Sequence, residues 1–230
     1  MILVTGDSFT AGEESPLSWP ELIPGAVNYA GSGFSNDAIV KTTVEMMELS
    51  TWDAVIVCWT TPHRIEVNNQ HLTPSSHRKY GSICDYVFLD WDEEWAIKKF
   101  RTQVLLLDSY LRDREVPYIF VRTFDVPIFN VGKWAEGSIV EWMGDCPKGP
   151  GGHPLELGHQ RIAEKINEHT DRVKHELSVI NGAGLAGYFL VVQDYCNWAR
   201  NQGWLTGRGH GHAGVDNTGH CAHPIGIAVS

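Results

Sequence analysis

The chain has 230 residues, 43% of them hydrophobic, which suffices for one domain of ordinary size with an appendage. Its net charge is −10, and residues 1–172 hold 15 Lys/Arg and 25 Asp/Glu, so the rest of the chain is neutral overall. This acidic body disfavours binding to nucleic acid or to an anionic membrane surface.

Strand and helix patterns alternate along the first 172 residues. Strands are predicted at 2–5, 26–29, 52–58 and 117–121, and helices at 18–23, 35–49, 91–114 and 155–173. The longest helix has Trp95, Phe100, Val104, Leu107 and Leu111 at the spacing of core residues. Residues 60–90 and 123–152 are predicted as loops. This order implies an α/β fold, a three-layer α/β/α sandwich with a mainly parallel sheet.

The start of the chain and its cysteines bear on its location. No basic-then-apolar leader precedes Ile2, and no apolar run reaches transmembrane length. The five cysteines are scattered and odd in number, which is typical of reduced thiols. We therefore expect synthesis in the cytoplasm and no membrane partner.

Ser8 lies on the turn after the first apolar run, Ile2–Thr5, where Gly6 breaks the strand. Ligands of open α/β sheets bind outside the carboxyl ends of the strands, so Ser8 is well placed to be a nucleophile. A serine hydroxyl needs a base, and the best candidate is His153, directly before a helical pattern. The alternative is that Ser8 and His153 only cap helices.

Three blocks in order resemble the SGNH (GDSL-type) hydrolases over residues 1–172. Gly6-Asp7-Ser8 with Gly12 resembles the first block, Asn28 to Asn36 the second, and His153-Pro154 with Gly158-His159 the last. The resemblance implies an SGNH-like fold and a serine esterase that needs no cofactor or metal. It further implies that the backbone amides of Ser8 and Gly33 form the oxyanion hole.

The orienting acid departs from the family pattern. The family has an Asp three residues before the histidine, where this chain has Pro150. Asp145 is the predicted substitute, and a backbone carbonyl that orients His153 is the alternative. His159 lies six residues further on, so it cannot share the role of His153 and is expected to pack or to hydrogen-bond.

The third block of the family also differs here. That block normally offers an asparagine side chain to the oxyanion, whereas this chain has Thr60 and Thr61 after the strand at 52–58. Either hydroxyl could donate instead. Arg64 is predicted to bind an anionic group of the substrate, and an ordinary strand-end turn is the alternative for all three residues.

Residues 173–230 are predicted to form a helical extension with a Gly/His-rich tail. Residues 176–200 resemble part of the alpha subunit of bacterial DNA polymerase III, but His210 and His212 replace the arginine and serine of its glycine-rich loop. The metal-binding aspartates would lie beyond Ser230, so polymerase activity is not expected. The cluster His210, His212, His220, Cys221 and His223 could ligate a zinc-like ion or belong to a loose tail.

Two functions from different classes remain open at this point. The first is an esterase acting on a small ester or an acylated carbohydrate, such as a sugar O-acetyl group. The second is an inactive SGNH-like phage protein, incorporated in a virion, that docks on a virion partner or forms a homo-oligomer through residues 173–230. A nucleic-acid-binding fragment is disfavoured by the acidic body and the neutral tail.

Overall fold

The computed structural model describes residues 1–67, 70–72 and 92–168, with Val191, Tyr195, Trp198 and the pairs 221–222 and 228–229 beyond them. The chain divides into two compact units, Met1–His169 and Thr170–Ser230. In the second unit, β8 (Cys221–Ala222) pairs antiparallel with β9 (Ala228–Val229). Most of the predicted helical extension and all histidines of the predicted cluster lie outside the described residues. Within the described part, no helix is long and apolar enough to cross a membrane.

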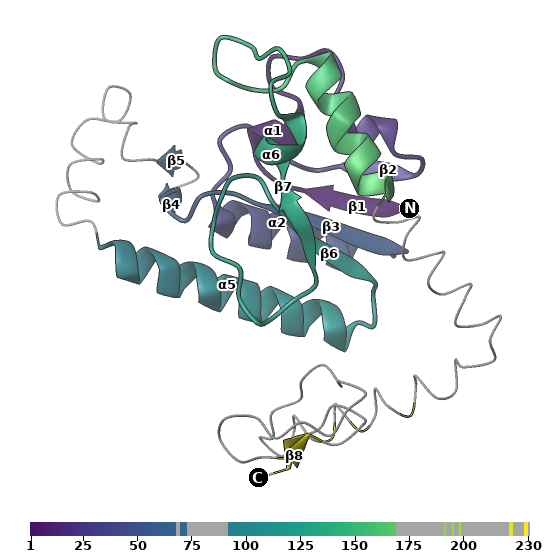
Figure 1. The fold of residues 1–230 in the computed structure, drawn as a ribbon, viewed down its shortest axis with the longest axis vertical. Helices are drawn as coiled ribbons and strands as arrows, with labels where there is room; N and C mark the ends of the chain where they lie inside the picture. The colour runs from purple at the N-terminus through teal and green to yellow at the C-terminus, as the bar shows by residue number, and fades with distance from the viewer. Residues whose placement is uncertain are drawn as a thin grey trace. The chain divides into compact units, whose positions relative to one another are not determined.

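A five-stranded parallel sheet forms the centre of the first unit (Figure 1). Its strands, in spatial order, are β2 (Ala26–Asn28), β1 (Ile2–Thr5), β3 (Ala54–Trp59), β6 (Tyr118–Arg122) and β7 (Trp134–Ser138). All four neighbouring pairs are parallel. The carboxyl ends of the strands therefore meet at one edge, where ligands of such sheets bind.

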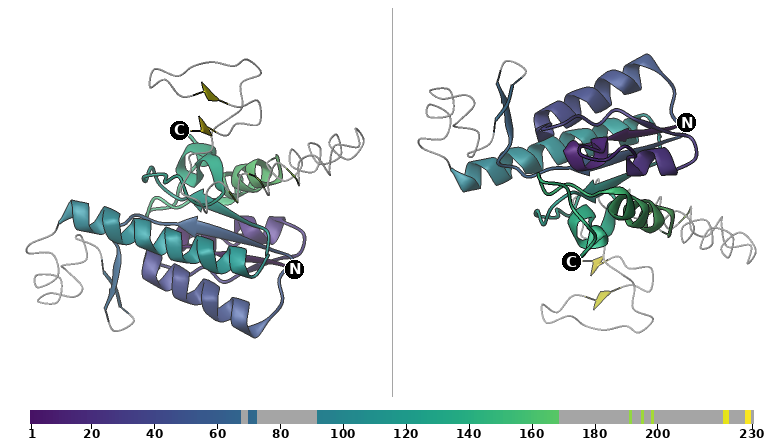
Figure 2. Two further views of the ribbon diagram at one scale, coloured as in Figure 1. Left: turned by 90° about the horizontal axis from the view of Figure 1, so that it is seen from below. Right: turned by 90° about the horizontal axis from the view of Figure 1, so that it is seen from above.

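Helices cover both faces of this sheet (Figure 2). On one face α2 (Asn36–Leu49) and α5 (Glu93–Asp113) pack against alternate strand residues such as Leu3 and Val55. On the other, η1 (Trp19–Leu22), α6 (Ile139–Met143) and the helix over 156–168 pack against Val4 and Ile56. Because both faces of the central strands are covered, these strands are continuous apolar runs. The predicted three-layer α/β/α sandwich is confirmed.

The two long helices start at caps that their sequences provide. The Ser35 hydroxyl accepts from the Ala38 amide at 3.3 Å, and the Asp92 carboxylate accepts from the Glu94 amide at 2.9 Å. The predicted core positions of α5 are buried from Phe100 to Leu111. Trp95 is the exception, with 49% of its surface exposed, because it lies in the first turn of α5, against Lys99.

Two regions predicted as loops contain short elements. Residues 123–152 include β7 and α6, and residues 60–90 include the hairpin of β4 (Ile65–Val67) and β5 (Gln70–Leu72). β7 is an edge strand with the sequence Trp-Ala-Glu-Gly-Ser, whose buried and exposed residues are mixed. It therefore lacks the continuous apolar run that identifies the central strands.

Candidate active site

Ser8 is the first residue of α1 (Ser8–Ala11), which begins immediately after the turn that ends β1. The Asp7 carboxylate caps this helix by accepting from the Phe9 amide at 3.2 Å. The turn requires a glycine at position 6, because a Cβ there would lie 2.6 Å from Thr10 Oγ1 and 2.8 Å from Cys58 Cβ. This close packing holds Ser8 at the carboxyl edge of the sheet.

The His153 ring faces the Ser8 hydroxyl across 145 residues of sequence. The distance from His153 Nε2 to Ser8 Oγ is 2.9 Å, which is hydrogen-bonding range for a base and its nucleophile. The Phe9 ring packs beside the His153 ring with centroids 5.0 Å apart. Both predicted residues therefore meet, and His159 lies elsewhere.

Glu14 occupies the other side of the His153 ring. Its Oε2 lies 2.9 Å from His153 Nδ1, while the Gly151 amide donates to Oε1 at 2.8 Å. The Gly151 amide and then the His153 ring are the main causes that lower the pKa of Glu14, which keeps this carboxylate ionised. An ionised acceptor at Nδ1 fixes the tautomer that leaves Nε2 free to take a proton from Ser8.

Asp145 does not take this place. Its side chain is 96% exposed, and its carboxylate accepts from Arg161 Nη1 at 3.2 Å. The loop of the histidine is instead shaped around Glu14, since a Cβ on Gly149 would lie 2.5 Å from Glu14 Oε2. Glu14, which the sequence interpretation missed, is the acid that the structure brings to His153. Two features of the sequence could have indicated this acid: Pro150 stands in the usual acid position, and two glutamates directly follow Gly12.

Glu13 places a second carboxylate near the same ring. Its Oε2 is 3.6 Å from His153 Nε2, on the side of the ring that faces Ser8. The Ser32 hydroxyl donates a hydrogen bond to this oxygen. Glu13 therefore bridges the turn of the nucleophile and the loop that carries Gly33.

Gly33 lies on the loop between β2 and α2 with a φ of 74°, a conformation that favours glycine. The loop is tied to the nucleophile turn by the Gly31 amide, which donates to the Gly6 carbonyl at 3.1 Å. The predicted oxyanion loop and the predicted nucleophile turn are thus neighbours.

The hydroxyl groups of the two threonines after β3 are already hydrogen-bonded to other side chains. Thr60 is fully buried, and its hydroxyl donates to Asp7 Oδ2 at 2.7 Å. A hydroxyl has one proton to donate, so Thr60 in this arrangement has none for an oxyanion. The Thr61 hydroxyl lies 2.8 Å from His63 Nδ1. The structure therefore does not support the Thr60 hydroxyl as a donor, and the role of Thr61 stays a prediction.

Arg64 is directed towards the fully buried Asp7 carboxylate, with Nη1 3.2 Å from Oδ2. The same nitrogen donates to the Phe34 carbonyl at 3.4 Å, and only 15% of the Arg64 side chain is exposed. Burial raises the pKa of Asp7, whereas the Arg64 guanidinium and the Thr60 hydroxyl oppose that rise. Arg64, which was predicted to bind an anionic group of the substrate, thus pairs with the buried Asp7 carboxylate within the fold.

His159 has a structural environment. Its side chain is fully buried, and its Nδ1 accepts from the Trp19 amide at 3.2 Å. Burial lowers the pKa of His159 to about 4, so the ring is neutral near pH 7. Its hydrogen bond connects the helix over 156–168 to η1.

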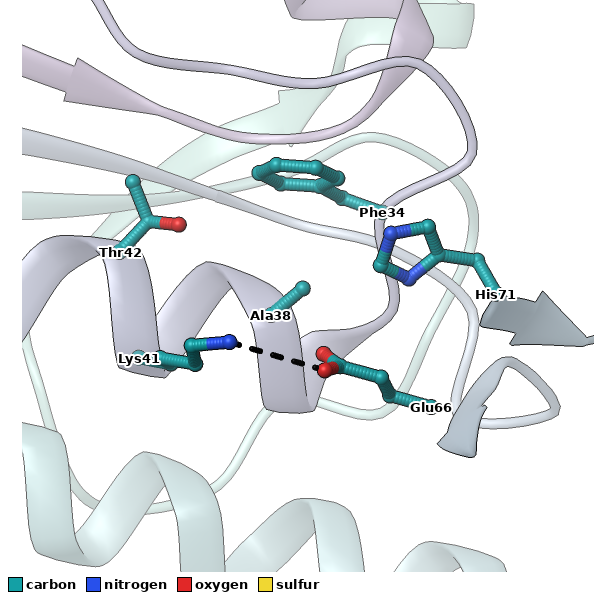
Figure 3. A pocket seen from close by; sticks show the side chains of 6 residues that line it. All are labelled: Phe34, Ala38, Lys41, Thr42, Glu66 and His71. Atoms are coloured by element: carbon teal, nitrogen blue, oxygen red, sulfur yellow. Dashed lines mark ion pairs between the residues drawn. The ribbon is translucent and has the colours of Figure 1, made fainter. Parts of the chain in front are cut away.

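A pocket of about 190 Å³ lies between α2 and the β4–β5 hairpin (Figure 3). Lys41 and Glu66 form an ion pair of 3.7 Å on one side, and the His71 ring packs against Phe34 on the other. Burial is the main cause that lowers the pKa of His71. The pocket adjoins the Gly33 loop through Phe34 but does not include Ser8 or His153.

The C-terminal part of the chain is similar to DNA polymerase subunits. The family model described as "Bacterial DNA polymerase III alpha NTPase domain" matches residues 155–220. DNA polymerase III subunit alpha of Aquifex aeolicus is 48% identical over 65 residues, and that of Thermus aquaticus is 50% identical over 60 residues. These matches cover 28% and 26% of this chain but only 5% of each subunit.

The fold of this chain is similar to that of a solved esterase. A psychrotrophic esterase, EstA from Pseudoalteromonas sp., superposes with a TM-score of 0.51 at 11% identity, covering 76% of this chain and 98% of that one. A member of the lipolytic protein G-D-S-L family from Veillonella parvula DSM 2008 has a TM-score of 0.42 at 14% identity, covering 73% and 96%. The chain thus shares its α/β/α fold with the solved esterase EstA.

Proposed function

We propose that the first unit is a serine esterase that hydrolyses a small acyl ester through Ser8 and His153. The observation that carries this proposal is the 2.9 Å distance between Ser8 Oγ and His153 Nε2. It is supported by Glu14 at the opposite nitrogen of the ring, which completes an acid–base–nucleophile arrangement.

In the proposed acylation step, Ser8 Oγ attacks the ester carbonyl carbon while its proton passes to His153 Nε2. The carbonyl oxygen becomes an oxyanion, for which the backbone amides of Ser8 and Gly33 are the proposed donors. One such donor, when preorganised, lowers the barrier by about 3–4 kcal/mol. His153 then gives its proton to the leaving alcohol, and an acyl-Ser8 intermediate remains.

Deacylation follows the same route with water as the nucleophile. His153 Nε2 takes a proton from water, whose oxygen attacks the acyl carbon. The Ser8 oxygen leaves and recovers a proton from His153, which releases the carboxylic acid and restores the enzyme. Glu14 stabilises the imidazolium form of His153 in both halves of the cycle without taking up a proton itself.

Labelling with a fluorophosphonate probe tests this function directly, because the probe reacts with activated serines. We expect the full chain to be labelled at Ser8 and the Ser8→Ala variant to remain unlabelled. Thr10→Ser, which supplies another buried hydroxyl on α1, is the matched control and should be labelled only at Ser8. An unlabelled wild-type chain with a native fold would contradict the proposal and favour the inactive alternative.

For the substrate, we propose an acylated carbohydrate or a similar small ester. The second unit remains open to a partner role, because Val191 and Tyr195, four residues apart, are both exposed. Homo-oligomer formation, a virion partner and a virion location stay predictions. A truncation after Arg172 that keeps its fold but changes its oligomeric state, measured by light scattering, would support a docking role.

A further inference from the structure

We infer that Glu13 selects the alcohol part of the ester, excluding anionic alcohols and favouring those that carry a hydroxyl or a cationic group. The inference rests on the proposed esterase function and concerns the same site. The Glu13 carboxylate lies beside His153 Nε2, the atom that must deliver a proton to the leaving alcohol.

The position of Glu13 relative to His153 assigns the side of the substrate that it meets. His153 Nε2 lies 2.9 Å from Ser8 Oγ and 3.6 Å from Glu13 Oε2. In ester cleavage this nitrogen protonates the leaving oxygen, so the alcohol passes next to Nε2. Substituents on the alcohol therefore come close to the Glu13 carboxylate, whereas the carbonyl oxygen of the ester points to the oxyanion donors.

The carboxylate is both held and accessible. The Ser32 hydroxyl donates to Glu13 Oε2, which restricts its side chain to the neighbourhood of the ring. The Glu13 side chain is nevertheless 44% exposed, three times the 14% of His153, so an incoming group can contact it. A fixed, accessible acceptor can take a hydrogen bond from a hydroxyl or pair with a cation.

The charges around the catalytic pair add to the effect. Glu14 sits behind the ring with a lowered pKa, so it carries a second negative charge. The guanidinium of Arg64, the residue predicted to attract an anion, faces the buried Asp7 instead. An anionic alcohol would thus be repelled by the carboxylates of Glu13 and Glu14 beside His153. The positive charge of Arg64 does not offset this repulsion, because it is paired with the Asp7 carboxylate.

The test uses four acetate esters that differ only in the alcohol: ethyl acetate, 2-hydroxyethyl acetate, acetylcholine and acetoxyacetate. For the full chain, we expect kcat/KM relative to ethyl acetate to be raised for the hydroxyl and cationic esters. For anionic acetoxyacetate it should be lowered, by roughly tenfold, as expected for unit charges a few ångströms apart in a medium close to water. The ratios for acetylcholine and acetoxyacetate should both move towards one as ionic strength rises, because exposed charges are screened.

Glu13→Gln should bring the charge-dependent ratios towards one, since the amide keeps the size of the side chain and removes its charge. Ser32→Ala, which releases the carboxylate, should also move these ratios towards one, by a smaller factor. Glu45→Gln is the matched control, because Glu45 is exposed on α2 about 13 Å along the helix from Asn36, so its ratios should equal the wild-type ratios.

The outcomes separate the two proposals. Unchanged ratios in a folded Glu13→Gln variant, with activity retained, would overturn the role of Glu13 and leave the esterase intact. Equal shifts in Glu13→Gln and Glu45→Gln would also overturn it, since the effect would then be one of overall charge. Absence of turnover of every ester by the wild-type chain, together with absence of probe labelling, would overturn the esterase and this inference with it.

Discussion

Glu14 Oε2 lies 2.9 Å from His153 Nδ1, although 139 residues separate the two in sequence. Because Ser8 opens the short helix that precedes Glu14, the nucleophile and the orienting acid come from one segment of seven residues. When the loop that carries His153 packs against this segment, His153 contacts both residues at the same time. The glycines of this loop permit this close docking, as the 2.5 Å approach of a Cβ on Gly149 to Glu14 Oε2 demonstrates.

The first prediction concerns Ser8. Ser8→Ala should abolish turnover of p-nitrophenyl acetate, because it removes the hydroxyl that lies 2.9 Å from His153 Nε2 and is the proposed nucleophile. The lost hydrogen bond should change stability by only about 1 kcal/mol, so the melting temperature should shift by a few degrees at most. Steady-state assays measure the turnover, and a thermal melt measures the change in stability. Equal turnover by the variant and the wild-type chain would refute Ser8 as the nucleophile.

Glu14→Gln should lower kcat by roughly 10²–10⁴-fold with little change in KM, because the amide cannot stabilise the imidazolium form of His153. Glu14→Asp should recover part of the loss, since it restores the charge at a longer distance. Asp145→Asn is the matched control and should retain wild-type kcat, as its carboxylate contacts Arg161. A loss in Asp145→Asn that matches the loss in Glu14→Gln would contradict the structure.

Gly149→Ala should reduce kcat even though residue 149 contacts no substrate. The new Cβ would lie 2.5 Å from Glu14 Oε2 and must displace either the carboxylate or the loop. Gly25→Ala is a useful comparison, because no atom lies within 4 Å of its Cβ position, although its φ of 79° is strained for alanine. It should lower stability without lowering kcat. Similar kcat values for the two variants would argue against the docking of Glu14.

His159 should make the stability of the first unit depend on pH. Its folded pKa of about 4 is below the ordinary 6.5, so the unfolded chain binds the proton more readily. Stability should therefore be complete above pH 6.5, fall as the pH drops towards 4, and lose no more from this group below that. The slope should approach about 1.4 kcal/mol per pH unit.

His159→Asn provides the comparison for this pH dependence. Its amide oxygen can accept from the Trp19 amide in place of Nδ1, but it cannot be protonated. Urea denaturation between pH 4 and 7.5 should show a smaller decline for the variant than for the wild-type chain. Parallel curves would mean that His159 does not titrate in this way.

Arg64→Met should destabilise the fold by about 3 kcal/mol, because it leaves the buried Asp7 carboxylate without its cation. Asp7→Asn added to Arg64→Met should recover part of that loss in denaturant unfolding. If Arg64 held an anionic substrate instead, Arg64→Met would raise KM for acetoxyacetate relative to ethyl acetate with stability unchanged. We expect the loss in stability and no selective change in KM.

The sequence by itself was enough to predict the layered α/β fold and the pair Ser8–His153. The central strands are continuous apolar runs and the helices have amphipathic spacing, so both patterns are local. β7 could not be predicted in this way, because an edge strand is only partly buried and its residues carry no such pattern.

Only the tertiary structure decided which charged groups meet at the site. Glu14 rather than Asp145 contacts His153, and Arg64 faces Asp7, because loops distant in sequence dock at the carboxyl edge of the sheet. A carboxylate is equally plausible in either loop when only its neighbours in sequence are known. The distance that makes it an orienting acid exists only once the chain has folded.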